Sequence, residues 1–478
     1  MRSIVWFRGK DLRVRDHAPL CQALTDGEVI PLFVLDPYFF APERALGMAH
    51  RMQFLLESLE VLERRIADLG SHLVVVAGRS TDRLPELAAR WRVDQVLAHR
   101  WSEPFGVLRD DRIRIDLEKI GVRFILHEGE TLVPPGSVLT GSGSMFHVFT
   151  PFARAFARQG SPEKPLPSPE SLPPLPSLEG DATAIPTLAS LGIRRNPHLP
   201  KGGEIEGLQR LADFQHEGLR GYHTARDRMA ESGTSRLSSD LHFGTLSVRT
   251  VWHGISCEAE GSQEDVACFL NELLWREFAH HLMAEEPRLL TEPFRLGFED
   301  FPWKGDERAW KAWTQGQTGF PVVDAAARQL LAEGYVHNRA RMVAASFLTK
   351  HLLLSYRRGE AHYLRWLMDG DWANNNMGWQ WSAGCGVDAQ PWFRIFNPIA
   401  QGERFDPEGL YVKRWLPELE GVPVKWIHRP WEAPEGVRKG LAYPSPIVDH
   451  GAARARFLAV AKGHLQRRER PWDGAPES

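Results

Sequence analysis

The sequence predicts two structural parts, an N-terminal doubly wound α/β domain and an all-helical C-terminal domain. At the start of the chain, short apolar runs alternate with helical patterns, which is typical of a parallel sheet covered on both faces. Ten of the 34 prolines then fall between Ser161 and Pro200, and 14 of the 17 tryptophans follow residue 200. A chain of 478 residues is also too long for a single hydrophobic core.

Residues 1–130 carry the α/β pattern. Apolar runs with the length and composition of buried strands lie at residues 4–7, 29–35, 73–78, 95–99 and 124–129, and the helical periodicity is clear at residues 52–69. The first run is followed by neither a GxGxxG loop nor a Walker lysine, so the usual dinucleotide site is not predicted. Such domains still bind ligands at the carboxyl ends of their strands. A small-molecule role and a purely structural role are both left open.

Residues 131–202 are predicted to be an interdomain linker, because proline-rich segments run extended over a surface and do not pack a core. After this segment the strand-like alternation nearly disappears. Residues 203–478 are therefore predicted to form the helical domain.

The composition restricts the class of protein. Four scattered cysteines form no CxxC pair, zinc spacing or disulfide pattern, which predicts a cytoplasmic protein with no metal. The chain starts without a leader-like pattern and has no apolar run of about 18 residues, so we expect no membrane association. With a net charge of −3, contact with nucleic acid requires a local basic patch.

Two stretches of the helical part suit anions. Residues 233–247 cluster Ser and Thr with Arg236, and hydroxyls and amides at a helix start form an anion site suited to a diphosphate. Capping residues without a phosphate are far commoner, however. Residues 335–366 hold six Lys or Arg against one acid, Glu360, which makes a local basic patch.

A third stretch, residues 271–278, places an acid, a ring and a cation on one helical face. These residues are Glu272, Trp275 and Arg276, at positions i, i+3 and i+4. The alternative is an ordinary ion pair on the surface of a helix.

The most unusual stretch is residues 369–398, which has four Trp and four Asn and no ordinary amphipathic pattern. Three consecutive Asn at 374–376 gain nothing from apolar burial, and buried amides need hydrogen-bond partners. Trp379 and Trp381 point to different sides of a helix, so one ring can face a cofactor and the other a second ligand. The alternative, an aromatic-rich loop in a helical core, accounts less well for the amides.

These stretches, with WFRGKDLRVRDHAPL at residues 6–20 and VFTPF at residues 148–152, resemble the photolyase/cryptochrome family, and most closely its class I cyclobutane pyrimidine dimer photolyases. The resemblance covers nearly the whole chain. It implies an N-terminal antenna domain, a long interdomain loop and a helical domain that holds FAD folded into a U. It also implies that the helical domain receives a damaged dinucleotide flipped out of UV-damaged DNA. We expect a monomer.

The family's flavin contacts are carried over by position. Those to the phosphates and the ribityl chain fall on Tyr222, Thr234, Ser235, Arg236, Leu237 and Ser238, and those to the isoalloxazine fall on Asn338, Arg341, Asp369, Asp371 and Asn375. Arg341 and Asp369 are expected to pair beside the ring, because a guanidinium stabilises a negatively charged reduced flavin. Asn375 resembles the amide that faces flavin N5, where plant-type cryptochromes have Asp. This residue therefore favours repair over signalling.

The resemblance also implies a substrate site at Arg226, Glu272, Trp275, Asn338, Arg339, Met342, Trp381 and Arg394. Trp275 and Trp381 would stack on the flipped dimer, each worth about 1–3 kcal/mol. Photolyases are among the enzymes that extrude their target base, at a cost of a few kcal/mol, and stacking of this size offsets that cost. Glu272 would stabilise the negative charge on the dimer. The candidate catalytic residues are Glu272, Asn338, Met342 and Asn375.

Three functions compete. Relatives that repair the (6-4) photoproduct carry two His where this chain has Asn338 and Met342, and Met cannot protonate a substrate oxygen. We therefore expect repair of cyclobutane dimers, in which photoexcited reduced FAD donates an electron, the ring splits and the electron returns. The alternative is a blue-light receptor, against which stand the stacking pair, Asn375 and the short ending after about residue 465. A third reading, a flavoprotein that binds DNA without repair, stays open.

Two further expectations concern electron and energy transfer. Family members reduce the flavin through three Trp in a row; the inner and outer ones match Trp379 and Trp303, but the middle one is Tyr356. Tyr carries a hole only by losing its proton, whose pKa is about 10, so photoreduction should be slow and pH-dependent unless Trp310 or Trp366 supplies a bypass. The antenna chromophore of the family is a folate, a deazaflavin or a flavin. Residues 101–112 have a pattern similar to a deazaflavin pocket.

Overall fold

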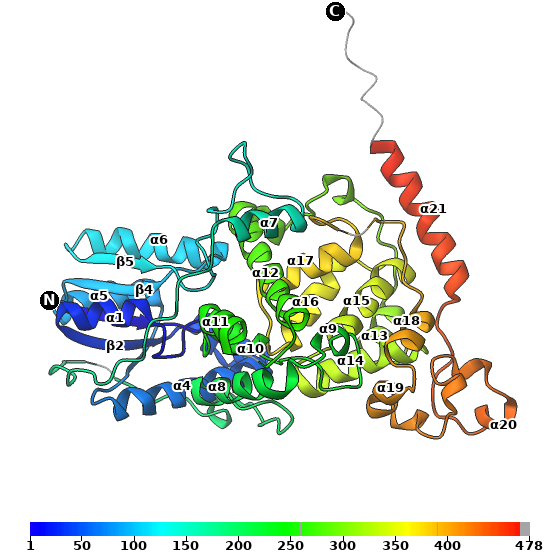
Figure 1. Cartoon of the computed structure of the whole chain (residues 1–478), viewed down its shortest axis with the longest axis horizontal. Helices are drawn as coiled ribbons and strands as arrows, with labels where there is room; N and C mark the ends of the chain where they lie inside the picture. Colours follow the sequence, from blue (N-terminus) through cyan, green and yellow to red (C-terminus); the bar gives the residue numbers. More distant parts are fainter. Residues whose placement is uncertain (181, 259, 390, 469–478) are drawn as a thin grey trace, which may run out of the picture. The chain divides into compact units, whose positions relative to one another are not determined.

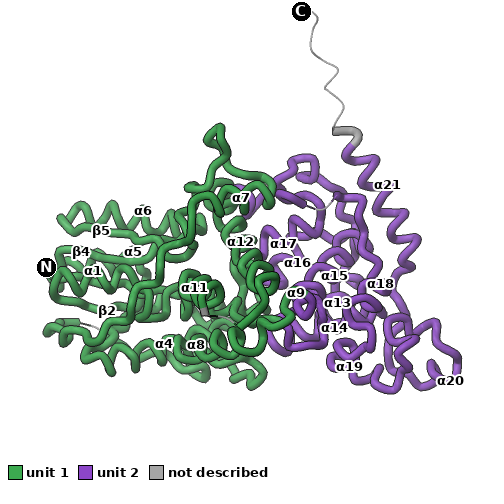
Figure 2. Tube along the Cα trace, in the orientation of Figure 1, with its two compact units in different colours: residues 1–223, 234–287, 365–373 green, residues 224–233, 288–364, 374–478 purple. Residues whose placement is uncertain are grey.

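The structure, a computed structural model, describes residues 1–180, 182–258, 260–389 and 391–468 (Figure 1). The chain forms two compact units (Figure 2). The first unit comprises residues 1–223, 234–287 and 365–373, and the second comprises residues 224–233, 288–364 and the chain from residue 374 onward. Each unit therefore contains segments that are distant in the sequence.

A five-stranded parallel sheet belongs to the first unit. Its strands are β1 (Arg2–Phe7), β2 (Glu28–Leu35), β3 (Val74–Ala77), β4 (Gln95–His99) and β5 (Arg123–His127), in the order β3-β2-β1-β4-β5. From β1, the strands β2 and β3 are added on one side and β4 and β5 on the other. The change of side lies between β1 and β4, which is the switch point of a doubly wound fold. The predicted α/β fold is confirmed.

Helices cover both faces of this sheet. Those that carry most of the packing are α1 (Ala18–Asp26), α4 (Ala49–Asp68), α5 (Ser80–Arg90) and α6 (Pro104–Glu118). Successive strand residues face opposite sides: Val5 packs in a cluster with residues of α1 and α4, whereas Ile4 packs in a cluster with residues of α5 and α6. Burial on both faces explains why the strand sequences are apolar throughout and do not alternate.

The remaining helices of the first unit are mostly short. They are α2 (Pro37–Phe40), α3 (Pro42–Leu46), α7 (Phe149–Arg158), α8 (Glu204–Asp213), the π-helix η2 (Phe214–Gly218), α10 (Ser238–Phe243), α11 (Val248–Glu258) and α12 (Gln263–Glu285). The long helix α12 begins at a capping box formed by Ser262 and Asp265. Between α7 and α8 the described residues form one 3-10 turn, η1 (Ala189–Leu191), and no other helix or strand.

The second unit is helical, and its described residues contain no strand. Its α- and π-helices are α13 (Glu307–Thr314), α14 (Pro321–Glu333), α15 (Asn338–Ser346), η5 (Phe347–His351), α16 (Tyr356–Trp366), α17 (Trp372–Ala383), α18 (Pro398–Phe405), α19 (Leu410–Trp415), α20 (Glu435–Arg438) and α21 (His450–Arg468). Short 3-10 turns lie at Pro287–Leu290, Leu296–Phe298, Pro417–Leu419, Val424–Trp426 and Pro430–Glu432. The predicted helical C-terminal architecture is confirmed.

Among the described residues, three α-helices have residues in both units, namely α16, α17 and α9 (Tyr222–Ala225), and so does the 3-10 turn Pro287–Leu290. Within the ranges that the structure describes, no helix combines the length and the apolar character needed to cross a membrane.

Candidate functional site

The hydroxyl-rich segment lies in the first unit, directly before α10. Arg236 has a left-handed backbone with φ of 55°, and Ser235 Oγ accepts a hydrogen bond from the Leu237 amide at 3.4 Å. Leu237 is buried and anchors this turn, after which α10 starts at Ser238. The turn therefore presents the hydroxyls of Thr234, Ser235 and Ser238 close together in the chain, which suits phosphate oxygens.

Tyr222 is held by the start of α12. Its ring packs against Phe214 and Phe269, with centroid distances of 5.6 and 5.4 Å. Asp265 of the capping box accepts hydrogen bonds at 3.0 Å from the amides on either side of Tyr222, those of Gly221 and His223. The capping box thus fixes the backbone at a predicted cofactor residue.

The predicted acid and ring on α12 have different surroundings. Trp275 is half-buried, and Phe149 stacks on one of its faces at 3.6 Å and an interplanar angle of 8°. Arg276 donates to the Glu130 carbonyl at 2.8 Å. Glu272, one turn before Trp275, is also half-buried. One face of the Trp275 ring is thus taken by Phe149, and the partly exposed remainder can meet a planar ligand.

Asp371 is a buried carboxylate before α17, 6% exposed. Its Oδ2 lies 3.5 Å from His280 Nε2 and 3.9 Å from His242 Nδ1, and its amide donates to the Asp369 carbonyl at 2.7 Å. Burial opposes the charge, but His280, His242 and Lys10 outweigh burial and hold the pKa of Asp371 well below its usual range. Asp371 is therefore ionised in the folded protein.

In the second unit, α15 carries the predicted residues Asn338, Arg339, Arg341 and Met342. Arg339 forms a two-point ion pair with Asp227, with distances of 2.7 and 3.0 Å. Arg341 Nε donates to the Val336 carbonyl at 2.7 Å. The expected pair of Arg341 with Asp369 joins residues of different units and stays a prediction.

The other two predicted phosphate-binding arginines differ in exposure. Arg226 is half-buried and Arg394 is exposed. The Arg394 carbonyl accepts a hydrogen bond at 2.7 Å from Nζ of Lys350. Lys350 is fully buried, and this burial lowers its pKa to about 7. The backbone of the exposed arginine is thereby tied to the core of the second unit.

Two amides of α17, those of the half-buried Asn375 and the buried Asn376, have hydrogen-bond partners. Asn375 Nδ2 donates to the Glu360 carbonyl at 3.1 Å, and Asn376 Nδ2 donates to Glu360 Oε1 at 2.8 Å and to the Leu289 carbonyl at 2.9 Å. Glu360, which the sequence indicated only as the lone acid of a basic stretch, therefore orients the amide predicted to face flavin N5.

Glu360 also makes the stability of the fold depend on pH. Burial raises its pKa from 4.5 to about 7, so the folded protein holds a proton that the unfolded chain releases. The stabilisation is complete below pH 4.5 and is lost as the pH rises to about 7; a shift of this size is worth about 3 kcal/mol. Between pH 5 and 7.5, the free energy of unfolding should fall by about 2 kcal/mol less in Glu360→Gln than in the unmodified protein, as measured in urea titrations. Parallel pH curves would contradict the prediction.

The two tryptophans of the WQW sequence have different environments, as expected from their spacing. Trp379 is 3% exposed, and Gly359 leaves the room for it, because a Cβ at Gly359 would lie 2.2 Å from the Trp379 ring. Trp381 is half-buried. One ring therefore packs in the core of the second unit, and the other remains accessible to a ligand.

Two sets of rings in the second unit bear on electron transfer. Tyr356 contacts Trp303 at a centroid distance of 6.5 Å. Trp379 contacts Trp313 at 6.1 Å, and Trp313 stacks on Trp310 at 5.6 Å. Trp310 is half-buried, so this second set connects the buried Trp379 to a partly exposed indole.

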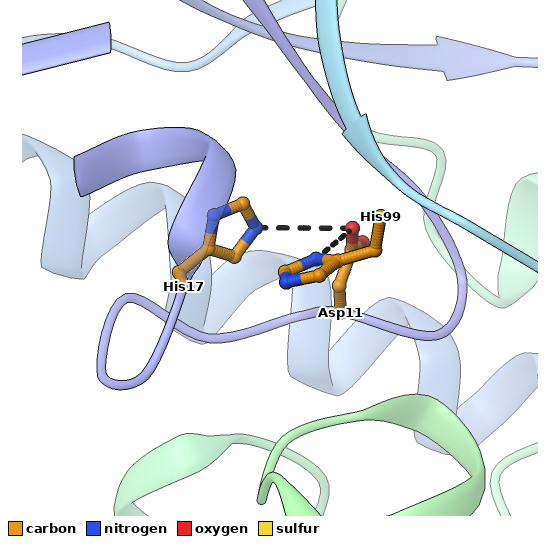
Figure 3. Close-up of side chains that lie close together, drawn as sticks. All are labelled: Asp11, His17 and His99. Atoms are coloured by element: carbon orange, nitrogen blue, oxygen red, sulfur yellow. Dashed lines mark hydrogen bonds and ion pairs between the residues drawn. The ribbon is translucent and has the colours of Figure 1, made fainter. Parts of the chain in front are cut away.

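A separate polar cluster in the first unit joins Asp11, His17 and His99 (Figure 3). Asp11 Oδ2 lies 3.1 Å from His99 Nδ1 and 3.8 Å from His17 Nε2. His17 Nδ1 accepts the Leu20 amide at 3.2 Å, so the proton of the neutral ring is on Nε2, which faces Asp11. This tautomer suits a hydrogen-bonded network and not a metal ligand, which would need a free lone pair on Nε2.

Comparison with known proteins identifies the family of the chain. Residues 3–170 match the family described as DNA photolyase, and residues 269–463 match the FAD binding domain of DNA photolyase. The chain is 39% identical to deoxyribodipyrimidine photo-lyase of Agrobacterium fabrum, over 96% of this chain and 97% of that protein. It is 36% identical to the Escherichia coli protein of the same name, over 96% and 98%.

Solved structures give the same result. A bacterial class III photolyase from Agrobacterium tumefaciens superimposes with a TM-score of 0.90 and 38% identity, covering 98% of both chains. A Synechocystis cryptochrome gives 0.89 and 29%, covering 96% of this chain and 99% of that one. An archaeal photolyase from Sulfolobus tokodaii, solved with two FAD molecules, gives 0.82 and 30%, covering 98% and 100%. The chain belongs to the DNA photolyase family.

Proposed function

We propose that this protein is a deoxyribodipyrimidine photo-lyase that splits cyclobutane pyrimidine dimers in DNA under light. The observation that carries the proposal is Trp275, a half-buried ring stacked by Phe149 on one face. Stacking on aromatic rings is how proteins hold unpaired bases, and Glu272 lies on the same helix, one turn away.

The residues that would hold FAD offer suitable chemistry. The hydroxyls of Thr234, Ser235 and Ser238, with Tyr222, Arg236 and Leu237, would bind the phosphates and ribityl chain. Amides and charged groups suit the polar edges of the ring system, and these are Asn338, Arg341, Asp369, Asp371 and Asn375. When bound, reduced FAD supplies the electron after light absorption. Glu360 fixes the Asn375 amide, and the guanidinium of Arg341 would stabilise negative charge on the ring.

The decisive experiment illuminates reduced, FAD-loaded protein with an oligonucleotide that contains one thymine dimer. Loss of the dimer, followed by chromatography, is the expected result. The similarity to a cryptochrome makes a blue-light receptor the second candidate. If the dimer survives saturating light, the repair function is wrong; selective binding without repair would then indicate a DNA-binding flavoprotein, and no binding would indicate a receptor.

The DNA contacts predict a specific salt dependence. Each phosphate contact contributes about −0.9 to the slope of log K against log salt, so Ala at Arg226, Arg339 or Arg394 should flatten the slope by about one unit. Asp227→Asn should tighten binding of damaged and intact DNA alike. The Asp227 carboxylate pairs with the Arg339 guanidinium and so competes with a DNA phosphate for it. Arg100→Ala, a surface change elsewhere, serves as control. An unchanged slope in the three arginine variants would argue against phosphate contacts.

A second, light-harvesting chromophore would belong to residues 1–130, the proposed antenna domain, with residues 131–202 as linker and 203–478 as the repair domain. At the carboxyl ends of β1 and β4, the Arg109 guanidinium lies 4.8 Å from the Trp6 ring and 4.4 Å from the Trp101 ring. Rings and cations of this kind stack on planar molecules. The absorption spectrum of the purified protein distinguishes a folate, a deazaflavin and a second flavin, and gel filtration tests the proposed monomer.

A further inference from the structure

Lys10 is a buried lysine in the segment between β1 and α1. Its side chain is 8% exposed. Nζ pairs with Glu130 Oε1 and lies 2.7 Å from Glu103 Oε1 and 3.9 Å from Asp371 Oδ2. Glu103 directly precedes α6, Glu130 follows β5 and Asp371 precedes α17. One cation therefore ties together four segments of the first unit.

The same cluster contains groups with the chemistry of metal ligands. Atoms of Glu130, His280 and Asp371 lie within 4.8 Å of one another. The Lys10 ammonium lies against the carboxylates of two of these residues, Glu130 and Asp371, and would repel a divalent cation bound to them. The cluster is thus organised around a lysine.

The charge of Lys10 matters because the carboxylates around it are buried. Burial lowers the pKa of Lys10, but Glu103, Glu130 and Asp371 outweigh burial and raise it, so the ammonium stays charged. Burial raises the pKa of Glu103 to about 7, which leaves Glu130 and Asp371 as the main negative charges. Without Lys10, these two buried carboxylates would face each other without the ammonium that compensates them.

We propose that Lys10 is a positioning residue for the flavin, and that its ammonium fixes the place and the charge of the Asp371 carboxylate predicted to contact the ring system. This inference rests on the proposed FAD site. It differs from a purely structural role, because the charge of Lys10 would act on the bound ring through Asp371 and not only on the fold.

The test compares Lys10→Met, Lys10→Arg and Glu103→Gln with a control, Lys119→Met, whose side chain is 62% exposed. Lys10→Met should bind FAD at least tenfold more weakly in fluorescence titrations of the apoprotein. It should also disfavour reduced FAD over oxidised FAD tenfold, which lowers the two-electron midpoint potential by about 30 mV. Lys10→Arg should keep most of the FAD affinity and of the midpoint potential of the unmodified protein, and the control should change neither quantity.

Lower thermal stability of Lys10→Met with unchanged FAD affinity and potential would overturn the proposal. If Lys10→Met does not fold, Glu103→Gln decides, with the potential measured at pH 8, above the pKa of Glu103. There the substitution removes a negative charge that competes with Asp371 for the Lys10 ammonium and should raise the potential, and an unchanged potential overturns the proposal. These readouts are separate from repair. A protein that binds FAD without splitting dimers refutes the proposed function while the potentials still test Lys10.

Discussion

Photoreduction of the oxidised flavin should slow at least tenfold in Trp313→Phe and in Trp310→Phe, and much less in Tyr356→Phe. The reason is the connectivity of the rings. Trp379 contacts Trp313, and Trp313 stacks on the half-buried Trp310. Indoles can carry a hole without releasing a proton at once, so this set forms an all-tryptophan route in the second unit, through one of the two tryptophans considered as a bypass.

Tyr356 is poorly placed for the same task. Its ring is 2% exposed, and its hydroxyl has no acceptor among the described residues. Burial raises the pKa of this phenol well above its usual value. A tyrosine must lose its proton to hold a hole, and among the described residues none accepts a hydrogen bond from this hydroxyl. Trp366, the other candidate bypass, belongs to the first unit and lies 5.8 Å from His50.

The measurement is the rate of flavin reduction under blue light with an external reductant, from pH 6 to 9. Trp426→Phe, a half-buried tryptophan on a 3-10 turn of the same unit, is the matched control. Dimer splitting by chemically reduced variants should stay at the unmodified rate. Trp313 Nε1 donates to the Ala344 carbonyl at 3.1 Å, so Trp310→Phe is the cleaner variant. If Tyr356→Phe alone abolishes photoreduction, the electron passes through the tyrosine.

The sequence could predict the sheet and the helical part because both depend on local patterns. The five apolar runs match the five strands, since burial on both faces leaves a continuous apolar signal. The consecutive Asn residues likewise predicted amides with hydrogen-bond partners, of which Asn376 is buried and Asn375 half-buried. Their partners could not be predicted: Asn376 bonds the Leu289 carbonyl, 87 residues away. A backbone acceptor at that separation leaves no trace in the pattern of side chains.

The missed residues are those that support a predicted residue from a distance. Phe149 lay in the VFTPF motif, but nothing local showed that it stacks on Trp275. Asp227 and Lys10 lie in segments far along the chain from Arg339 and Asp371, with which they pair. Resemblance to a family predicts the residues that contact a ligand, because they match the family position by position. The residues that hold those side chains in place depend on tertiary packing and were not predicted.

Trp381→Ala should weaken binding of dimer-containing DNA by about 1–3 kcal/mol, the value of one base stacked on a ring, or about 5- to 150-fold. Trp275→Ala should have an effect of similar size. Binding of intact DNA and the salt slope should hardly change, because a ring contributes no charge to the phosphate contacts. The preference for damaged DNA, and not the overall affinity, is therefore the quantity that falls.

Phe149 allows a sharper test of the stacking role. Its ring lies 3.6 Å from that of Trp275, so Phe149→Leu keeps a hydrophobic neighbour but removes the flat surface that orients the indole. This variant should lose part of the preference for dimers while Trp275 itself is intact, and Trp275→Phe should recover part of what Trp275→Ala loses. Titrations with damaged and intact duplexes of one sequence, with Trp426→Ala as control, make the comparison. Equal losses on both duplexes would show that these rings stabilise the protein and do not read the flipped bases.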